Sequence, residues 1–75
     1  MNKARRKKIE EIREAISSLY DDLESVKIDE EDAFDNLPES LQESDRGESM
    51  QDAIDHLDSA CDMLQEAIDE LEDIE

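Results

Sequence analysis

Carboxylates are the side chains that could do chemistry in this chain, because 25 of its 75 residues are Asp or Glu. Such oxygens bind Mg²⁺ and Ca²⁺, and carboxyl groups with raised pKa values act as general acids or bases. The densest run, residues 29–32, lacks the glycine and spaced oxygens of an EF-hand loop. His56 is the single histidine and Cys61 the single cysteine, so one chain cannot assemble a histidine-rich zinc or di-iron centre. We expect no metal site and no cofactor.

A second carboxylate pattern gives no stronger indication of catalysis. Glu10, Glu11 and Glu14 match the Glu-Glu-x-x-Glu element of the all-α nucleoside triphosphate pyrophosphatases. The Glu-x-x-Asp element of that family should follow after a short turn and helix, but here it first occurs at Glu66 and Asp69, far too late. The sequence also offers no Gly-rich phosphate loop and no Ser/His/Asp constellation. We therefore expect that the protein is not an enzyme.

The charge is unevenly distributed along the chain. The formal net charge is −17, yet the first eight residues hold five of the eight bases, so residues 9–75 carry a net −22. A body of that charge repels nucleic acid and anionic membranes and attracts basic surfaces. The sequence shows no apolar run of membrane-spanning length and no signal-peptide core, which predicts a cytoplasmic protein without direct DNA, RNA or membrane binding.

The elements that position these charges are two helices with apolar heptads. In the second, apolar residues alternate at spacings of four and three, which is the a/d pattern of a helix that buries one stripe. Its seam is Met50, Ile54, Leu57, Cys61, Leu64, Ile68 and Leu71, with Cys61 at position a as a small core residue. Ala53, Ala60, Ala67 and Ile74 recur at g and widen the stripe. This pattern predicts a helix over residues 47–74.

The first helix is predicted over residues 9–35 by the same periodicity. Its seam is Ile9, Ile12, Ile16, Leu19, Leu23 and Val26. Residues 1–8 are expected to form a basic N-terminal end. They either begin this helix or form a frayed approach to it, because positive charge at a helix N-terminus opposes the helix dipole. Pro38 ends the first helix and begins a short helical turn within the connection, residues 36–46. Asp45 and Glu48 resemble a capping box, which places the second helix start near Arg46.

Together these elements predict a single all-α domain over residues 1–75. Its architecture is a two-helix antiparallel coiled-coil hairpin with a short helical turn in the connection. A lone hairpin of this size is marginally stable, and a stripe three positions wide suits a bundle. We therefore expect self-association, most simply of two hairpins into a four-helix bundle.

The acidic face of the second helix is the candidate partner site. From Gly47 to Glu75 there are eleven acids and no Lys or Arg. Carboxylates recur at heptad positions b and f, about 10 Å apart within a column. Interleaved, the b and f charges approximate the pitch of phosphates along a nucleic-acid strand. The predicted partner-binding set is Asp52, Asp55, Asp62, Met63, Glu66, Asp69 and Asp73, with Met63 as an apolar anchor. The alternative is an ordinary solvated helix face.

Two further functions remain open from the sequence. An oligomer could bind a signalling nucleotide through the basic residues Lys3, Arg5, Arg6, Lys7, Lys8 and Arg46. The chain could also be a purely structural oligomerisation module.

The connection AFDNLPESLQESDRGE, from Ala33 to Glu48, and the flanking heptads resemble small acidic helical-hairpin proteins of phages and prophages of Gram-positive bacteria. This resemblance implies an accessory or counter-defence factor that acts by binding in the host cytoplasm. Small acidic phage proteins often imitate DNA to occupy a host nucleic-acid-binding protein, whereas other small helical phage oligomers sequester signalling nucleotides. The resemblance thus implies a basic host protein as the partner, with a nucleotide as the alternative ligand.

Overall fold

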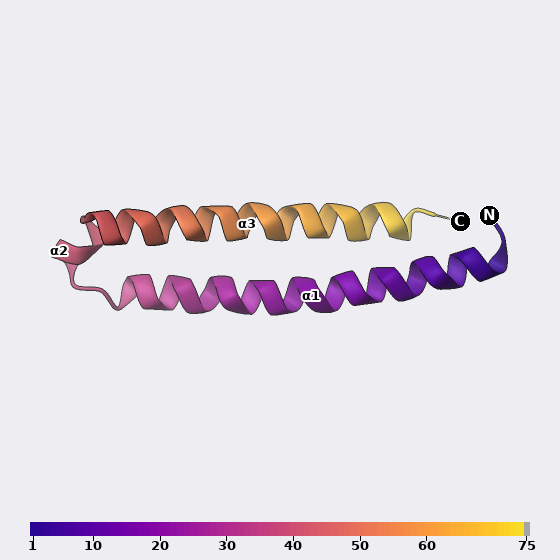
Figure 1. Ribbon diagram of the computed structural model, residues 1–75, viewed down its shortest axis with the longest axis horizontal. Helices are drawn as coiled ribbons and strands as arrows, with labels where there is room; N and C mark the ends of the chain where they lie inside the picture. Colours follow the sequence, from indigo (N-terminus) through magenta and orange to yellow (C-terminus); the bar gives the residue numbers. More distant parts are fainter. Residues whose placement is uncertain (75) are drawn as a thin grey trace.

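The computed structural model describes residues 1–74 as a helical hairpin (Figure 1). Helix α1 spans Lys3–Asp35, helix α2 spans Glu39–Gln42 and helix α3 spans Asp45–Glu72. The two long helices pack antiparallel, and both chain ends lie at the end of the rod opposite α2. The rod measures 58 × 14 × 12 Å. The predicted all-α antiparallel hairpin with a short helical turn in its connection is therefore confirmed.

Helix α1 begins at Lys3, so the basic residues 3–8 form its first turns. The side chain of Asn2 caps it, since Asn2 Oδ1 accepts a hydrogen bond from the Arg5 backbone N–H at 2.9 Å. Asn is among the best N-cap residues, and Ala, Arg and Lys have high helix propensity. These contributions offset the unfavourable interaction of the bases with the helix dipole, which solvent weakens at an exposed end.

A glutamine side chain from α2 closes the turn end of the hairpin. Gln42 Nε2 donates hydrogen bonds to the carbonyl oxygens of Phe34 and Leu37, both at 3.1 Å. The carbonyl groups of the last helical turn have no partner within the helix itself. Phe34 O also accepts from the Leu37 backbone N–H at 3.0 Å, so Gln42 adds a second bond to it and a bond to Leu37 O beyond the helix. These bonds tie the end of α1 to α2.

Helix α3 begins one residue after Ser44, so the predicted Asp45 capping box is wrong. Ser44 is the N-cap residue, and its carbonyl accepts from the Glu48 backbone N–H at 2.9 Å. Its hydroxyl donates instead to the Leu41 carbonyl oxygen, so no side chain caps the helix. Gly47 is buried in this first turn against the main chain of Gln42. The sequence pattern missed this close approach of α2.

The predicted seam of α3 faces α1. Cys61 and Ile68 are its most buried side chains, at 4% and 5% exposed. The remaining seam residues are half-buried: Met50, Ile54, Leu57, Leu64 and Leu71. Among the g positions Ala60 and Ala67 are half-buried, whereas Ala53 and Ile74 are exposed. The packed stripe of α3 is thus centred between positions a and d.

Helix α1 presents a different face from the one predicted. Its a positions Ile9, Ile16 and Leu23 are half-buried as expected, but its d positions are exposed: Ile12 is 44%, Leu19 60% and Val26 53% exposed. The e positions take their place and are half-buried: Arg13, Tyr20, Lys27 and Phe34. Two e positions carry aromatic rings, and the other two carry long stems whose charges pair with α3, so this face buries more surface and gains two ion pairs.

Candidate functional site

The acidic face of α3 lies on the side of the helix away from α1. Helix residues advance by 100° each, so positions b and f lie roughly opposite the midpoint between a and d. All seven residues of the predicted partner-binding set are exposed: Asp52, Asp55, Asp62, Met63, Glu66, Asp69 and Asp73. Met63 is 68% exposed, the highest value of any large apolar side chain in the described residues. The predicted columns therefore form one continuous outward surface.

The carboxylates of this face make no ion pair within residues 1–74. The two ion pairs of the described chain join Arg13 Nη1 to Glu72 Oε1 at 3.6 Å and Lys27 Nζ to Asp58 Oδ1 at 3.1 Å. Both acids occupy position e, outside the b and f columns. Within the face, Asp69 Oδ1 accepts a hydrogen bond from Gln65 Nε2 at 3.0 Å. The field of the face is thus left uncompensated by neighbouring bases.

The ion pairs run along one side of the hairpin, where the pKa values of two side chains are raised. The hydrogen bond to Asp58 raises the pKa of Lys27, and partial desolvation opposes this rise. A hydrogen bond with Glu24, four residues further along α1, raises the pKa of Tyr20 because the neutral phenol is the donor. Both groups stay in their neutral-pH forms. The Lys27–Asp58 pair joins α1 to α3.

The basic residues of the alternative nucleotide site do not converge within one chain. Lys3, Arg5, Arg6, Lys7 and Lys8 are exposed on the first turns of α1, at the open end of the rod. Arg46 is exposed in the first turn of α3, at the turn end. The rod is 58 Å long, so a nucleotide cannot touch both groups of the same chain.

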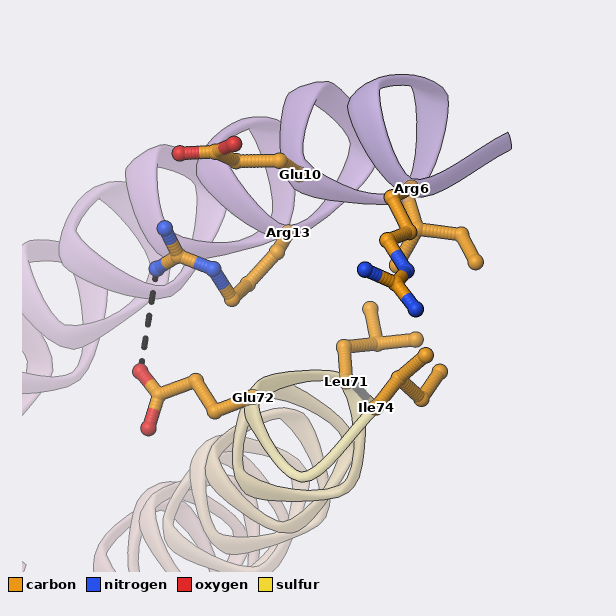
Figure 2. A pocket seen from close by; sticks show the side chains of 7 residues that line it. Arg6, Glu10, Arg13, Leu71, Glu72 and Ile74 are labelled. Atoms are coloured by element: carbon orange, nitrogen blue, oxygen red, sulfur yellow. Dashed lines mark ion pairs between the residues drawn. The ribbon is translucent and has the colours of Figure 1, made fainter. Parts of the chain in front are cut away.

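A cleft at the open end is lined by Arg6, Ile9, Glu10, Arg13, Leu71, Glu72 and Ile74 (Figure 2). Its volume is about 570 Å³. Arg6 and Arg13 are one heptad apart on α1, and Arg13 is half-buried whereas Arg6 is exposed. Figure 2 shows Arg13 directed to Glu72 by the ion pair, while Arg6 lies beside Leu71 and Ile74. Two bases and two acids line the cleft, so it is not the positive pocket that an anionic nucleotide requires.

No other arrangement in the described residues suggests catalysis or metal binding. Residues 1–74 contain no cluster of three or more His, Cys, Asp or Glu side chains that could hold a metal ion. Glu66 and Asp69 point outward from α3, so they do not meet Glu10, Glu11 and Glu14 as a pyrophosphatase site would require. His56 is exposed and the Cys61 thiol is free and buried.

Over the described residues, none of the helices combines the length and apolar character that a membrane crossing needs.

Comparison with known proteins leaves the fold and the surface as the basis for assigning function. No protein-family model, curated protein or solved structure matches the chain. Its geometry is that of an acidic helical hairpin whose helix α3 carries an exposed carboxylate face.

Proposed function

We propose that this chain is a non-enzymatic accessory protein that binds the basic surface of a host factor through the acidic face of α3. The observation that supports the proposal is that every charged side chain of this face is negative. Carboxylates at b and f are exposed, and residues 47–75 contain no Lys or Arg. Lys residues at i+4 from these acids would stabilise the helix, so a purely structural bundle gains from mixing the two signs.

The mechanism is competition for phosphate-binding side chains. Carboxylates at Asp55, Asp62 and Asp69 follow one another at heptad spacing, about 10 Å apart. Interleaved with the f-position acids, they offer Lys and Arg side chains of the partner a row of anions in place of nucleic-acid phosphates. The partner loses its nucleic acid while the hairpin is bound. Such binding weakens steeply with added salt.

The functional form is a homodimer of hairpins arranged as a four-helix bundle. The elongated shape and the exposed Ile12, Leu19 and Val26 support self-association. The proposed place of action is the cytoplasm of the host cell, in keeping with the phage-protein resemblance of the connection. There the Cys61 thiol stays reduced.

A charge-reversal pair of variants tests the acidic face. The variant Asp55→Lys/Asp62→Lys/Asp69→Lys reverses three charges of the face, and the control Glu11→Lys/Glu14→Lys/Asp21→Lys makes the same charge change on exposed sites of α1. Each protein serves as bait in a pull-down from host lysate. The captured protein is then titrated with labelled DNA in the presence and absence of the hairpin.

We expect the face variant to lose the captured protein and the control to retain it, with both helical by circular dichroism. Capture of the same protein by the face variant and the parent would show that the face is merely solvated. A captured protein that binds DNA equally well with and without the hairpin would refute the competition mechanism.

A further inference from the structure

An exposed apolar band without a packing partner in the described residues runs along the side of the hairpin opposite the ion pairs. On α1, positions d and e flank the buried a positions, so Ile12, Leu19 and Val26 lie on the opposite side from Arg13 and Lys27. On α3, positions e and g flank the seam in the same way. Figure 2 shows Glu72 directed away from Ile74, which lies two residues beyond the end of α3.

The ion pairs also show which residues of α1 and α3 lie at the same height along the rod. The residue numbers of Lys27 and Asp58 add to 85, and so do those of Arg13 and Glu72. Leu19 is therefore level with residues 66 and 67. The d positions of α1 and the g positions of α3 form one band on the free side: Ile12, Leu19, Val26, Ala33, Ala53, Ala60, Ala67 and Ile74. No charged residue occupies these two columns between their ends.

The exposed area of the hairpin exceeds what its mass predicts. The accessible surface is 5708 Å², whereas a compact monomer of 8.6 kDa has about 4700 Å² by the usual mass scaling. The excess of about 1000 Å² is close to the ~800 Å² that each partner buries in a standard stable interface. The elongated hairpin therefore exposes enough surface to bury a standard interface against a second copy.

We infer that a second copy of this chain covers the band. The two rods run in opposite directions, an arrangement called head-to-tail below, and a two-fold axis passes at Leu19. This inference rests on the proposed self-association and adds the face and direction of packing. About that axis, two α1 residues lie opposite each other when their numbers add up to 38. Leu19 therefore meets Leu19 of the other copy, and Ile12 meets Val26. Face-to-face packing in this direction sets α1 on α1 and α3 on α3.

Charge complementarity decides the direction. Residues 3–8 carry five bases and no acid, and residues 29–35 carry five acids and no base. In the head-to-tail dimer residues 3–8 of one copy lie opposite residues 30–35 of the other, so each basic end neutralises an acidic turn end. In the parallel arrangement the two basic ends share one end of the bundle. The charges at the two ends of α1 therefore favour the head-to-tail direction.

The dimer face and the acidic face do not overlap. The band lies on one flat side of the hairpin, and the acidic face lies on the outer edge of α3. A dimer therefore leaves both acidic faces free. Loss of the dimer and loss of partner binding are separable outcomes, each with its own variants.

Sedimentation equilibrium of matched variants tests the face. Leu19→Asp places a charge at the centre of the band, whereas Ile28→Asp places one at a site 48% exposed on the other side of α1. We expect a mass of twice 8.6 kDa for the parent and the Ile28 variant. The Leu19 variant should bind itself at least about a hundredfold more weakly, because two carboxylates would be buried without partners. A folded parent monomer, or equal dimerisation of the Leu19 variant, overturns the inference.

Cross-linking tests the direction, and it does not depend on a destabilised variant. Leu19→Cys places two thiols on the proposed axis, so mild oxidation should give a disulfide-linked dimer at concentrations where the parent gives none. Asp55→Cys, exposed on the acidic face, is the control and should stay unlinked. In the parallel arrangement Leu19→Cys stays unlinked by itself and links to Ala67→Cys in a mixture. A link between Leu19→Cys and Ala67→Cys, or no link of Leu19→Cys to itself, refutes the head-to-tail dimer.

Discussion

Helix propensity predicts that replacing Gly47 with alanine stabilises the protein, whereas the packing of α2 against Gly47 predicts destabilisation. By helix propensity alone, Gly→Ala within α3 stabilises by up to about 1 kcal/mol. A Cβ at residue 47, however, would lie 2.5 Å from the Gln42 carbonyl carbon, 2.6 Å from Gln42 Cα, and closer still to its carbonyl oxygen. These are backbone atoms, so relief requires α2 to move off α3.

The size of the effect follows from what that movement breaks. Displacing α2 removes both hydrogen bonds from Gln42 to the end of α1, each contributing about 0.5–1.5 kcal/mol. Retaining them under strain costs about 1–3 kcal/mol by comparison with overpacked sites. After subtracting a propensity gain of about 1 kcal/mol, either route leaves a net destabilisation of up to about 2 kcal/mol. For a chain of this length each kcal/mol lowers the Tm by about 4–8 °C.

Thermal and urea denaturation followed by circular dichroism at fixed protein concentration measure this change. Ser49→Ala, at an exposed site of the same helix, is the control and should be neutral or slightly stabilising. Gln42→Ala removes the hydrogen bonds without a clash. Its effect should not add to that of Gly47→Ala, because both act on the same segment. A raised Tm for Gly47→Ala would refute the close packing of α2 on α3.

Three further predictions follow from the same geometry. Ile68→Ala should destabilise by about 2–4 kcal/mol in urea denaturation because Ile68 is buried, whereas Met63→Ala on the exposed face should change stability by less than about 0.5 kcal/mol. Lys27→Met should be less stable than the parent at neutral pH. The raised pKa of Lys27 means that its contribution is complete below the unfolded pKa of about 10.4 and is lost as pH rises through the folded value, so the two Tm curves should converge in alkali. Added NaCl should raise the Tm of the parent, since it screens the self-repulsion of a chain with net charge −17, and a falling Tm would contradict this.

Heptad spacing carries enough information to predict the hairpin but not the rotation of its helices. Apolar residues at both a and d made Ile12, Leu19 and Val26 look like core positions. The choice of a and e on α1 depends on pairs that reach across from α3, such as Lys27 with Asp58, and single-helix periodicity does not include them. The exposed d positions therefore became visible only when the two helices were placed together.

The ends of the helices show the same limit at shorter range. Asn2 is a recognisable N-cap in the sequence, but the run of bases after it favoured a later start of α1. At α3 a plausible Asp45–Glu48 pair concealed Ser44, whose role follows from the placement of α2. The exposure of the acidic face, in contrast, could be predicted, because columns of one charge have no place inside a hairpin.

Among residues 1–74 just three are buried, Gly47, Cys61 and Ile68. A fold with so little interior places few demands on the identity of each side chain, as long as apolar spacing is kept and residue 47 stays small. Most surface residues of the rod can therefore be exchanged without loss of the hairpin.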